Sequence, residues 1–351
     1  MKTRYSMTRL VFIGLLCLIL IVPACGPKTK IKHQPVQFSE VPSPHGKDQY
    51  PNWQVPPGVM EGKLARLIYE RHTSDIRVKR TARGTSGAHV DKVFFPTLGK
   101  EIKFKWKTAN FGSLDGFNNS PRRELAAYQV QKLFLDPQDY VVPTSIIHCV
   151  PREIYRQHNP DVPPSVEGTD CMVGLISIWM VDLTVPEVLL DETRFLNEPN
   201  YAYFLSNLNL TTYLINHQDA RTGNFLVSKD EKRRQAFSID NGISFGTWPH
   251  YFFGQNWDVI VVPALRKDSI ERLRKLQRQD LDFLGVVAQL EKDENLMLQP
   301  VPAGKNLDPV KGVRFKDGTV QFGLKKAEID GLWERIESLI AEVDSGKIPV
   351  F

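Results

Sequence analysis

The sequence predicts an α+β fold with two lobes, in which a β-rich first lobe precedes a mostly helical second lobe. Residues 76–181 carry several strand patterns and one helix pattern, whereas helical spacing dominates from Pro186 onward. That order favours segregated strands and helices over the regular alternation of a doubly wound sheet. About 290 residues follow the N-terminal segment, enough for a large core or for two lobes, and they contain no internal repeat.

The chain begins with the pattern of a signal peptide. Lys2, Arg4 and Arg9 make its start positive, and the apolar run Leu10–Val22 that follows is too short to span a membrane as a helix. The residues at the end of this segment, Val22-Pro23-Ala24-Cys25, resemble the lipobox of bacterial lipoproteins. In that family the cysteine, here Cys25, carries the lipid and becomes the mature N-terminus. An ordinary secretory signal cleaved nearby is the alternative.

The lipobox resemblance implies a location. Residues 1–24 would be removed, and Cys25 would anchor the protein to a membrane of the bacterial cell envelope, outside the cytoplasm. Gly26 in place of Asp favours the outer membrane if the host is Gram-negative. Residues 25–58 are rich in proline and polar residues, so we expect an extended spacer between the membrane and the folded domain.

The charge balance gives no reason to expect a nucleic-acid partner. The precursor has a net charge of +5, which falls to +2 when the three basic residues of the signal are removed. The basic segment Arg266–Arg278 is expected to be a solvated helix face. An acidic partner or a lipid headgroup is the alternative for this segment.

Two cysteines remain for the folded domain once those of the signal and the lipid anchor are set aside. Cys149 and Cys171 lie in the strand-like runs Val141–Val150 and Cys171–Val181. In an oxidising compartment an even pair of this kind can form a disulfide, here between neighbouring strands. Two buried free thiols are the alternative.

The first lobe is expected to begin with a helix and three strands. Helical spacing covers Gly62–Arg71. Strand patterns follow at Ile76–Arg80, Val90–Phe95 and Glu101–Lys107. A glycine turn, Gly84-Thr85-Ser86-Gly87, separates the first two strands.

A helix and two more strands complete this lobe. Ser120 and Pro121 suit the N-cap and first position of a helix over Arg122–Phe134, which contains Glu124. The two cysteine-bearing strands then flank a polar, proline-containing insertion at Pro151–Thr169.

The second lobe is expected to be helical apart from its candidate site and one hairpin. The hairpin is expected at Arg314–Val320, and an amphipathic helix over Lys325–Val343 is expected to pack against the rest of the lobe.

The most informative segment contains His217, Asp219, Asn224 and Asp240. The first three have the spacing H-x-D-x-x-x-x-N, and Asp240 follows a second short apolar run. Phosphoryl transfer uses such a set: an Asp orients the attacking hydroxyl, and an Asn and a second Asp hold the divalent ions that bridge the phosphates. We expect His217 to be a hydrogen-bonded scaffold residue rather than a proton carrier. Each Asp or Asn taken singly could instead be an ordinary turn residue.

The same chemistry needs a strand lysine to bind the phosphates and a helix glutamate to position that lysine. Lys103, Lys105 and Lys107 share one face of an alternating strand. Lys105 is the central one, with Trp106 on the opposite face, so we favour Lys105 as the phosphate ligand. Glu124 on the following helix is expected to pair with it.

Three short motifs give these residues a family resemblance. They are Phe-Lys-Trp at 104–106, Arg-Glu-Leu-Ala-Ala-Tyr at 123–128, and Ile-Asp-Asn-Gly-Ile-Ser-Phe at 239–245. They resemble the atypical kinases, namely the type II phosphatidylinositol 4-kinases, the bacterial phosphatidylinositol 3/4-kinase-like proteins and the secretory-pathway kinases of the Golgi casein kinase group. The resemblance covers about residues 76–260. Asp-Asn-Gly stands in place of Asp-Phe-Gly, and the glycine turn lacks the full G-x-G-x-x-G.

The resemblance implies a bilobal protein-kinase-like fold with an N-lobe at 59–181 and a C-lobe at 182–351. It also implies roles for individual residues. Asp219 would be the catalytic Asp, Lys105 and Glu124 would act together at the phosphates, and Asn224 and Asp240 would bind the metal. The nucleotide would further contact Gly84, Ser86, Gly87 and the hinge residues Met180 and Val181.

The expected reaction is transfer of the γ-phosphoryl group of ATP, with Mg²⁺ or Mn²⁺, to a hydroxyl of a protein, sugar or lipid outside the cytoplasm. A non-catalytic lipoprotein that keeps the fold to bind a ligand or partner is the main alternative. Another nucleotidyl chemistry, such as transfer of AMP, is a third. Zinc sites of the H-E-x-x-H or C-x-x-C type and a G-x-S-x-G hydrolase are excluded, because those motifs are missing from the sequence.

Overall fold

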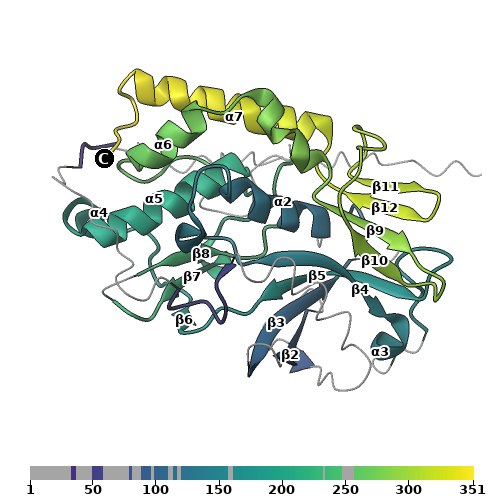
Figure 1. Cartoon of the computed structure of the whole chain (residues 1–351). Coiled ribbons are helices and arrows are strands. Elements are labelled where there is room, and N and C mark those ends of the chain that lie inside the picture. The colour runs from purple at the N-terminus through teal and green to yellow at the C-terminus, as the bar shows by residue number, and fades with distance from the viewer. Residues whose placement is uncertain are drawn as a thin grey trace, which may run out of the picture. The chain divides into compact units, whose positions relative to one another are not determined.

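The strands of the first part of the chain form one antiparallel sheet with the order β1-β2-β3-β5-β4 (Figure 1). They are β1 (Lys79–Arg80), β2 (His89–Phe95), β3 (Lys100–Thr108), β4 (Ser145–Pro151) and β5 (Cys171–Ile178). A computed structural model describes residues 33–36, 50–57, 79–80, 88–95, 99–109, 114–116, 120–156, 161–231, 234–246 and 257–351. The chain from His33 to Phe351 forms one compact unit. The fold is α+β, as the sequence predicts.

Strand β3 confirms the predicted alternation. Ile102, Phe104 and Trp106 are almost completely buried on one face of the sheet. The lysines at the alternate positions therefore project from the opposite face, because successive side chains of a strand point to opposite sides. This face of β3 is the one that contributes to the candidate site.

Strands β4 and β5 are neighbours, and a disulfide joins them. The bond links Cys149 to Cys171, whose Cα atoms are 5.4 Å apart. The sequence left a disulfide and two free thiols open, and the structure has the disulfide. Both strands are shorter than predicted, since β4 begins only at Ser145 and β5 ends at Ile178.

Helix α2 (Pro121–Gln131) begins where Ser120 and Pro121 predict, and it packs on β4 and β5. The backbone carbonyl of Ser120 accepts from the N–H groups of Arg123 and Glu124, so the cap uses the main chain. Arg122 is completely buried, and its Nη1 lies 2.6 Å from Oε2 of Glu328 in α7 (Lys326–Asp344). Because a buried ion pair resists separation, this contact holds the start of α2 in place.

A small three-stranded sheet has the order β6-β7-β8 and packs against α5, whereas α3 lies beside β4 and β5. Helix α5 is buried along almost its whole length and packs on β8, α2 and α7 (Figure 1). The elements are α3 (Arg152–Arg156), β6 (Leu183–Thr184), α4 (Glu192–Asn197), α5 (Pro199–Leu214), η2 (Thr222–Asn224), β7 (Phe225–Ser228), β8 (Ala236–Ser238) and α6 (Lys267–Arg274). The short 3-10 turn η1 (Pro137–Asp139) follows α2.

A second antiparallel sheet corrects the expectation of a helical C-terminal half. Its order is β10-β9-β12-β11, with β9 (Ala288–Lys292), β10 (Leu298–Val301), β11 (Val313–Lys316) and β12 (Thr319–Phe322). Only the β11–β12 hairpin was predicted; its turn residues Asp317 and Gly318 both have positive φ angles, which suits a tight hairpin. The other two strands are four and five residues long, too short for a clear alternating pattern.

The basic segment expected as one helix over 266–278 is divided. Helix α6 ends at Arg274, and the 3-10 segment η4 (Arg278–Gly285) follows. The C-terminal helix, in contrast, is confirmed as α7, which packs on η4, α5 and α6. Among the described residues, no helix is both long and apolar enough to cross a membrane.

Described parts of the segment expected as a free spacer pack against the domain instead. Gln34 donates its N–H to the carbonyl of Pro263 at 3.1 Å. Trp53 and Val55 are 5% and 3% exposed. Burial of two large apolar side chains is the physical reason, because it removes apolar area from water. Cys25, the glycine turn at 84–87 and the helix predicted at 62–71 lie outside the described residues.

Candidate functional site

The two loops that carry the diagnostic motif lie side by side, held by backbone hydrogen bonds. Ile239 donates to the carbonyl of Asn224 at 2.9 Å, and Gln218 donates to the carbonyl of Ile243 at 3.0 Å. The first of these bonds extends the β7–β8 pairing, which ends in the register Phe225 to Ser238. The loops are thereby fixed at the end of a two-stranded ribbon. Asn224 and Asp240, which are distant in sequence, come together for this reason.

Asp219 and Asn224 form the first half of the site. The Asn224 amide nitrogen donates to Oδ2 of Asp219 and to its backbone carbonyl, both at 2.8 Å. Arg221 reaches the other carboxylate oxygen, with Nε 3.0 Å from Oδ1. The Asp219 side chain is 13% exposed, although its Oδ1 atom is itself buried. A carboxylate oriented in this way can accept a hydrogen bond from a hydroxyl.

Asp240 lies where two lysines meet. Its Oδ1 is 2.5 Å from Nζ of Lys105 and 3.6 Å from Nζ of Lys107. Partial burial favours a raised pKa for Asp240, but the charges of Lys105 and Lys107 outweigh it and lower the pKa to about 2. The residue has a φ of 58°, the left-handed region that non-glycine residues seldom adopt. Such backbone strain is concentrated at functional sites.

The lysine that pairs with Glu124 is Lys107, which corrects the preference for Lys105. Nζ of Lys107 lies 3.0 Å from Oε1 of Glu124, and the two side chains are only 6% and 9% exposed. Burial tends to lower the pKa of Lys107, but Glu124 and Asp240 outweigh it, so the pKa lies above its usual value. The sequence placed all three β3 lysines on the correct face. The choice among them depended on where α2 lies along the strand, which spacing alone does not give.

Gly242 explains why a glycine follows Asp240-Asn241. A Cβ atom at this position would lie 3.2 Å from Oε1 of Glu124, closer than most side-chain contacts allow. The missing side chain lets the loop approach α2, so Glu124 touches both Lys107 and the loop. Asn241 is buried and bonds back to Ser238, whose hydroxyl lies 2.7 Å from its Oδ1.

His217 is completely buried beneath the two loops, with its ring 6.4 Å from that of Phe225. Burial lowers the pKa of His217 to about 4, although the backbone of Ile239 and the charge of Asp240 act in the opposite direction. A ring that is neutral at ordinary pH and enclosed by the loops is a structural support. Its role as proton carrier would require access that it lacks.

We call Lys105, Lys107, Glu124, Asp219, Asn224 and Asp240 the charged cluster. Its oxygen donors suit a hard divalent cation such as Mg²⁺, which binds to proteins through one or two carboxylates and completes its shell with water and phosphates. Among the described residues, no group of three or more His, Cys, Asp or Glu side chains gathers as a dedicated metal site would. Asn224 and Asp240 are the members of this cluster whose oxygens could hold such an ion.

The hinge segment, which we define as Trp179–Val181, leads out of β5. Met180 is 7% exposed and belongs to the main hydrophobic core. The backbone N–H and carbonyl groups of Trp179 and Val181 are already bonded within the chain. Val181 donates its N–H to the carbonyl of Asn52 at 3.0 Å, and its own carbonyl accepts from the Asn52 amide at 3.0 Å.

Gln54 makes similar contacts with Trp179, the first residue of the hinge segment, and with Lys103 of β3. Its amide nitrogen donates to the carbonyls of Trp179, at 2.5 Å, and Lys103, at 2.6 Å. Its Oε1 accepts from the N–H of Lys103 at 2.9 Å. Between these two side chains, Trp53 packs edge-on against Phe237 of β8, with ring centroids 6.0 Å apart. These contacts were not predicted, and their sequence signal is no more than a tryptophan in a polar, proline-rich segment.

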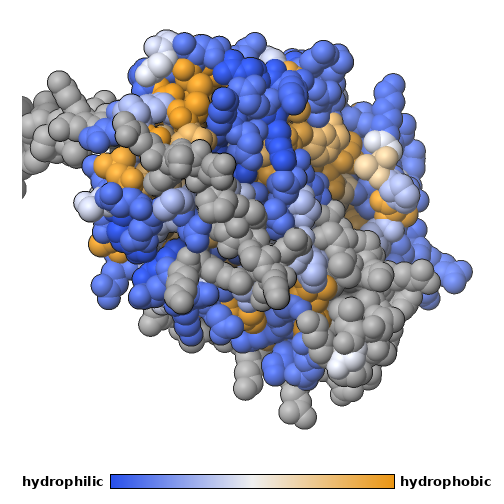
Figure 2. All heavy atoms as spheres, turned by 60° about the vertical axis from the view of Figure 1, so that its left-hand side comes forward, coloured by the Kyte–Doolittle hydropathy of each residue, from blue (hydrophilic) through white to orange (hydrophobic). Residues whose placement is uncertain are grey.

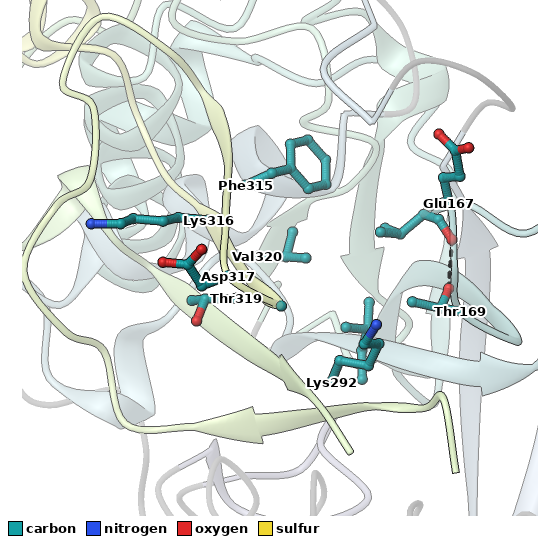
Figure 3. A pocket seen from close by; sticks show the side chains of 11 residues that line it. Glu167, Thr169, Lys292, Phe315, Lys316, Asp317, Thr319 and Val320 are labelled. Atoms are coloured by element: carbon teal, nitrogen blue, oxygen red, sulfur yellow. Dashed lines mark hydrogen bonds between the residues drawn. The ribbon is translucent and has the colours of Figure 1, made fainter. Parts of the chain in front are cut away.

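A pocket of about 290 Å³ lies between the β11–β12 hairpin and the loop before β5 (Figure 3). Glu167, Lys292, Phe315 and Asp317 are among its lining residues, and it contains no member of the charged cluster. In the view of Figure 2, apolar residues reach the surface in several separate patches.

Comparison with known proteins gives no relative from which a role could be transferred. No family model matches the chain, and no curated protein is similar to it.

Proposed function

We propose that this protein is an ATP- and metal-dependent phosphotransferase of the atypical-kinase type, with a bilobal kinase-like fold. The observation that carries the proposal is the buried Lys107–Glu124 pair beside Asp240. Phosphoryl transfer needs a lysine fixed by a glutamate next to a metal-binding Asp. The Asp219–Asn224 pair on the adjoining loop supplies the remaining two groups.

Each residue of the charged cluster then has a distinct task. Lys107 and Lys105 bind phosphate oxygens and disperse charge in the transition state. Glu124 keeps Lys107 in position, and Asp219 orients the acceptor hydroxyl and receives its proton. Asn224 and Asp240 would hold Mg²⁺ or Mn²⁺, which supplies positive charge against the phosphates.

The location and acceptor belong to the same proposal. A lipid on Cys25 would hold the domain at the envelope membrane, where the acceptor hydroxyl belongs to a protein, a sugar or a lipid. No nucleic acid is involved, since the charge of the mature chain is close to neutral.

A thermal melt of the full chain in detergent, with and without ATP plus Mn²⁺, tests the nucleotide site. At a hundred times the dissociation constant, binding stabilises the native state by about 2.7 kcal/mol, a shift of several degrees. Asp240→Ala should lose this shift, whereas Asp161→Ala, an exposed control, should keep it. No metal-dependent shift in the parent would contradict the proposal.

Turnover tests the assignment of the catalytic Asp. Asp219→Ala should bind ATP as well as the parent does but transfer phosphate at least about a hundredfold more slowly. Transfer to the acceptor, or to water, can be followed with γ-labelled ATP. Parent-level activity in this variant would rule out the mechanism.

A non-catalytic, ligand-binding lipoprotein is the second candidate, and one observation favours it. The carbonyls of Trp179 and Val181 and the N–H of Val181 are bonded to Asn52 and Gln54 rather than being open to a nucleotide. Failure of every nucleotide to bind, even with both amides removed, would leave this candidate in place of the kinase.

A further inference from the structure

We propose that residues 50–57, which we call the strap, occupy the position of the adenine base and must leave it before a nucleotide can bind. The inference deepens the proposed function, on which it rests, by adding a regulatory contact at the same site. Its basis is the set of hydrogen bonds between the strap and the hinge segment, together with the burial of Trp53.

The strap presents to the hinge segment the same kinds of hydrogen-bonding group that adenine would present. Adenine presents a hydrogen-bond donor and a neighbouring acceptor along one edge, and backbone N–H and C=O groups are the usual partners that orient such ligands. Asn52 presents the same pair to Val181: its carbonyl accepts the N–H, and its amide donates to the carbonyl. Gln54 adds a donor to the carbonyl of Trp179. These backbone groups cannot serve a base while the two amides hold them.

The strap also carries an aromatic ring, that of Trp53, between Asn52 and Gln54 in the chain. Trp53 is 5% exposed and packs on Phe237, which lies on β8 directly before the segment that carries Asp240. The two rings meet edge to face, at an interplanar angle of 74°, so Trp53 fills an apolar space in which a purine ring could lie. The strap thus supplies both the polar edge and the aromatic ring of a base, from within the same chain.

The strap is held by side-chain contacts and by burial rather than by strand pairing. Its Asn52 and Gln54 side chains and one main-chain carbonyl contact the hinge segment, and Trp53 and Val55 are buried. It contributes no strand to a sheet. It contains Pro51, Pro56 and Pro57, which cannot donate a backbone hydrogen bond. Its departure would therefore leave the sheet ladders intact.

The strap acts as a tethered competitor, so a nucleotide binds only to the fraction of molecules in which it is displaced. The apparent dissociation constant is then the intrinsic one divided by that fraction. Weakening the strap should improve affinity without any new contact to the ligand. In a lipid-anchored chain the strap lies between the anchor and the domain, where a partner that binds this segment would open the site.

The test compares the full chain, in detergent, with the double variant Asn52→Ala/Gln54→Ala, using adenosine and ATP plus Mn²⁺ as probes in isothermal titration. We expect both probes to bind the variant at least about tenfold more tightly than the parent. Gln34→Ala, which removes an exposed amide of the same N-terminal region, should leave the affinity unchanged. Equal affinity of parent and double variant for both probes would overturn the strap while leaving the kinase proposal standing.

The two probes separate the two ideas. If adenosine gains affinity but ATP plus Mn²⁺ binds no better than adenosine, the strap is supported and the phosphoryl-transfer proposal fails. If neither probe binds either protein, both fail. Hydrogen–deuterium exchange of residues 50–57 in the parent gives an independent result should the variant not fold: saturating adenosine must speed their exchange, and unchanged exchange would overturn the strap.

Discussion

The two ends of the candidate site, the charged cluster and the hinge segment, are held in place by different kinds of contact. In the charged cluster, functional side chains hold one another: Lys107 pairs with Glu124 and Asp219 with Asn224, while Asp240 stays 35% exposed between two lysines. At the hinge segment, the polar groups belong to the backbone, and a distant part of the chain satisfies them. The first end is ordered by ion pairs and hydrogen bonds among its own side chains, whereas the second is ordered by contacts with residues 50–57.

A phosphate group and an adenine base need different kinds of binding site. A phosphate requires fixed positive charge, which buried ion pairs provide without any ligand. A base requires free backbone donors and acceptors, which cost free energy if they are left unpaired. A chain that prepares a base site in advance must either leave these groups to water or cover them itself. This chain covers them.

The largest expected effect comes from replacing the two β3 lysines of the charged cluster one at a time. Lys107→Met should lower the free energy of unfolding by about 3–5 kcal/mol, because it leaves the buried Glu124 carboxylate without its cation. Lys105→Met should cost less than about 1 kcal/mol, since its partner Asp240 is partly exposed and keeps Lys107. Denaturant unfolding of both variants measures the difference. Equal costs, or the reverse order, would show that Lys107 is not the anchor of the charged cluster.

The next effect is a pH dependence that belongs to His217. Its pKa falls from 6.5 to about 4 on folding, so the unfolded chain binds the proton more readily. The contribution of His217 to the free energy of unfolding is therefore full above pH 6.5. It is lost as the pH falls toward about 4, which lowers the free energy of unfolding by about 3 kcal/mol in total. Asp240, with its pKa of about 2, loses its contribution only at lower pH.

Replacing His217 should remove this slope. We expect His217→Gln to flatten the free energy of unfolding between pH 4.5 and 6.5. The measurement is a series of denaturant titrations across that range. An unchanged slope in His217→Gln would mean that folding does not lower the pKa of this ring, contrary to its scaffold role.

The disulfide should affect stability but neither end of the site. Its cysteines are 22 residues apart, so reduction or the double change Cys149→Ser/Cys171→Ser should lower the free energy of unfolding by about 2–3 kcal/mol. β5 leads directly into the hinge segment, yet its pairing with β3 and β4 does not depend on the bond. Nucleotide affinity should therefore match that of the parent. A large loss of affinity would mean that the bond, and not the ladder, positions the hinge segment.

The sequence predicted the charged cluster better than the hinge segment for a physical reason. Asp219, Asn224 and Asp240 lie on adjoining loops of one ribbon, so local spacing fixes their geometry. Asn52 reaches Val181 across more than a hundred residues, and no periodicity reports such a contact. Local pattern likewise could not choose Lys107 over Lys105, because that choice depends on how α2 lies against β3.

The fold shows the same division. Strand β3 and helix α7 were predicted nearly to the residue because each has a strong period, of two and of 3.6 residues. The β9–β12 sheet was predicted only at its Asp317–Gly318 turn, where backbone chemistry is local. Its short strands become strands by pairing with one another, which is a tertiary effect that overrides weak propensity.

The smallest expected effect distinguishes the two contacts of Asp219. Arg221 is 57% exposed, so its ion pair with Asp219 is screened by water, and Arg221→Ala should change the free energy of unfolding by less than about 1 kcal/mol. Asn224 is buried and bonds to Asp219 twice, so Asn224→Ala should cost more, about 1–3 kcal/mol. Both can be measured by denaturant unfolding of the protein without nucleotide. If Arg221→Ala costs as much as Asn224→Ala, the exposed arginine helps to hold the catalytic loop, and Asp219 would depend on solvent-screened charge rather than on the buried amide.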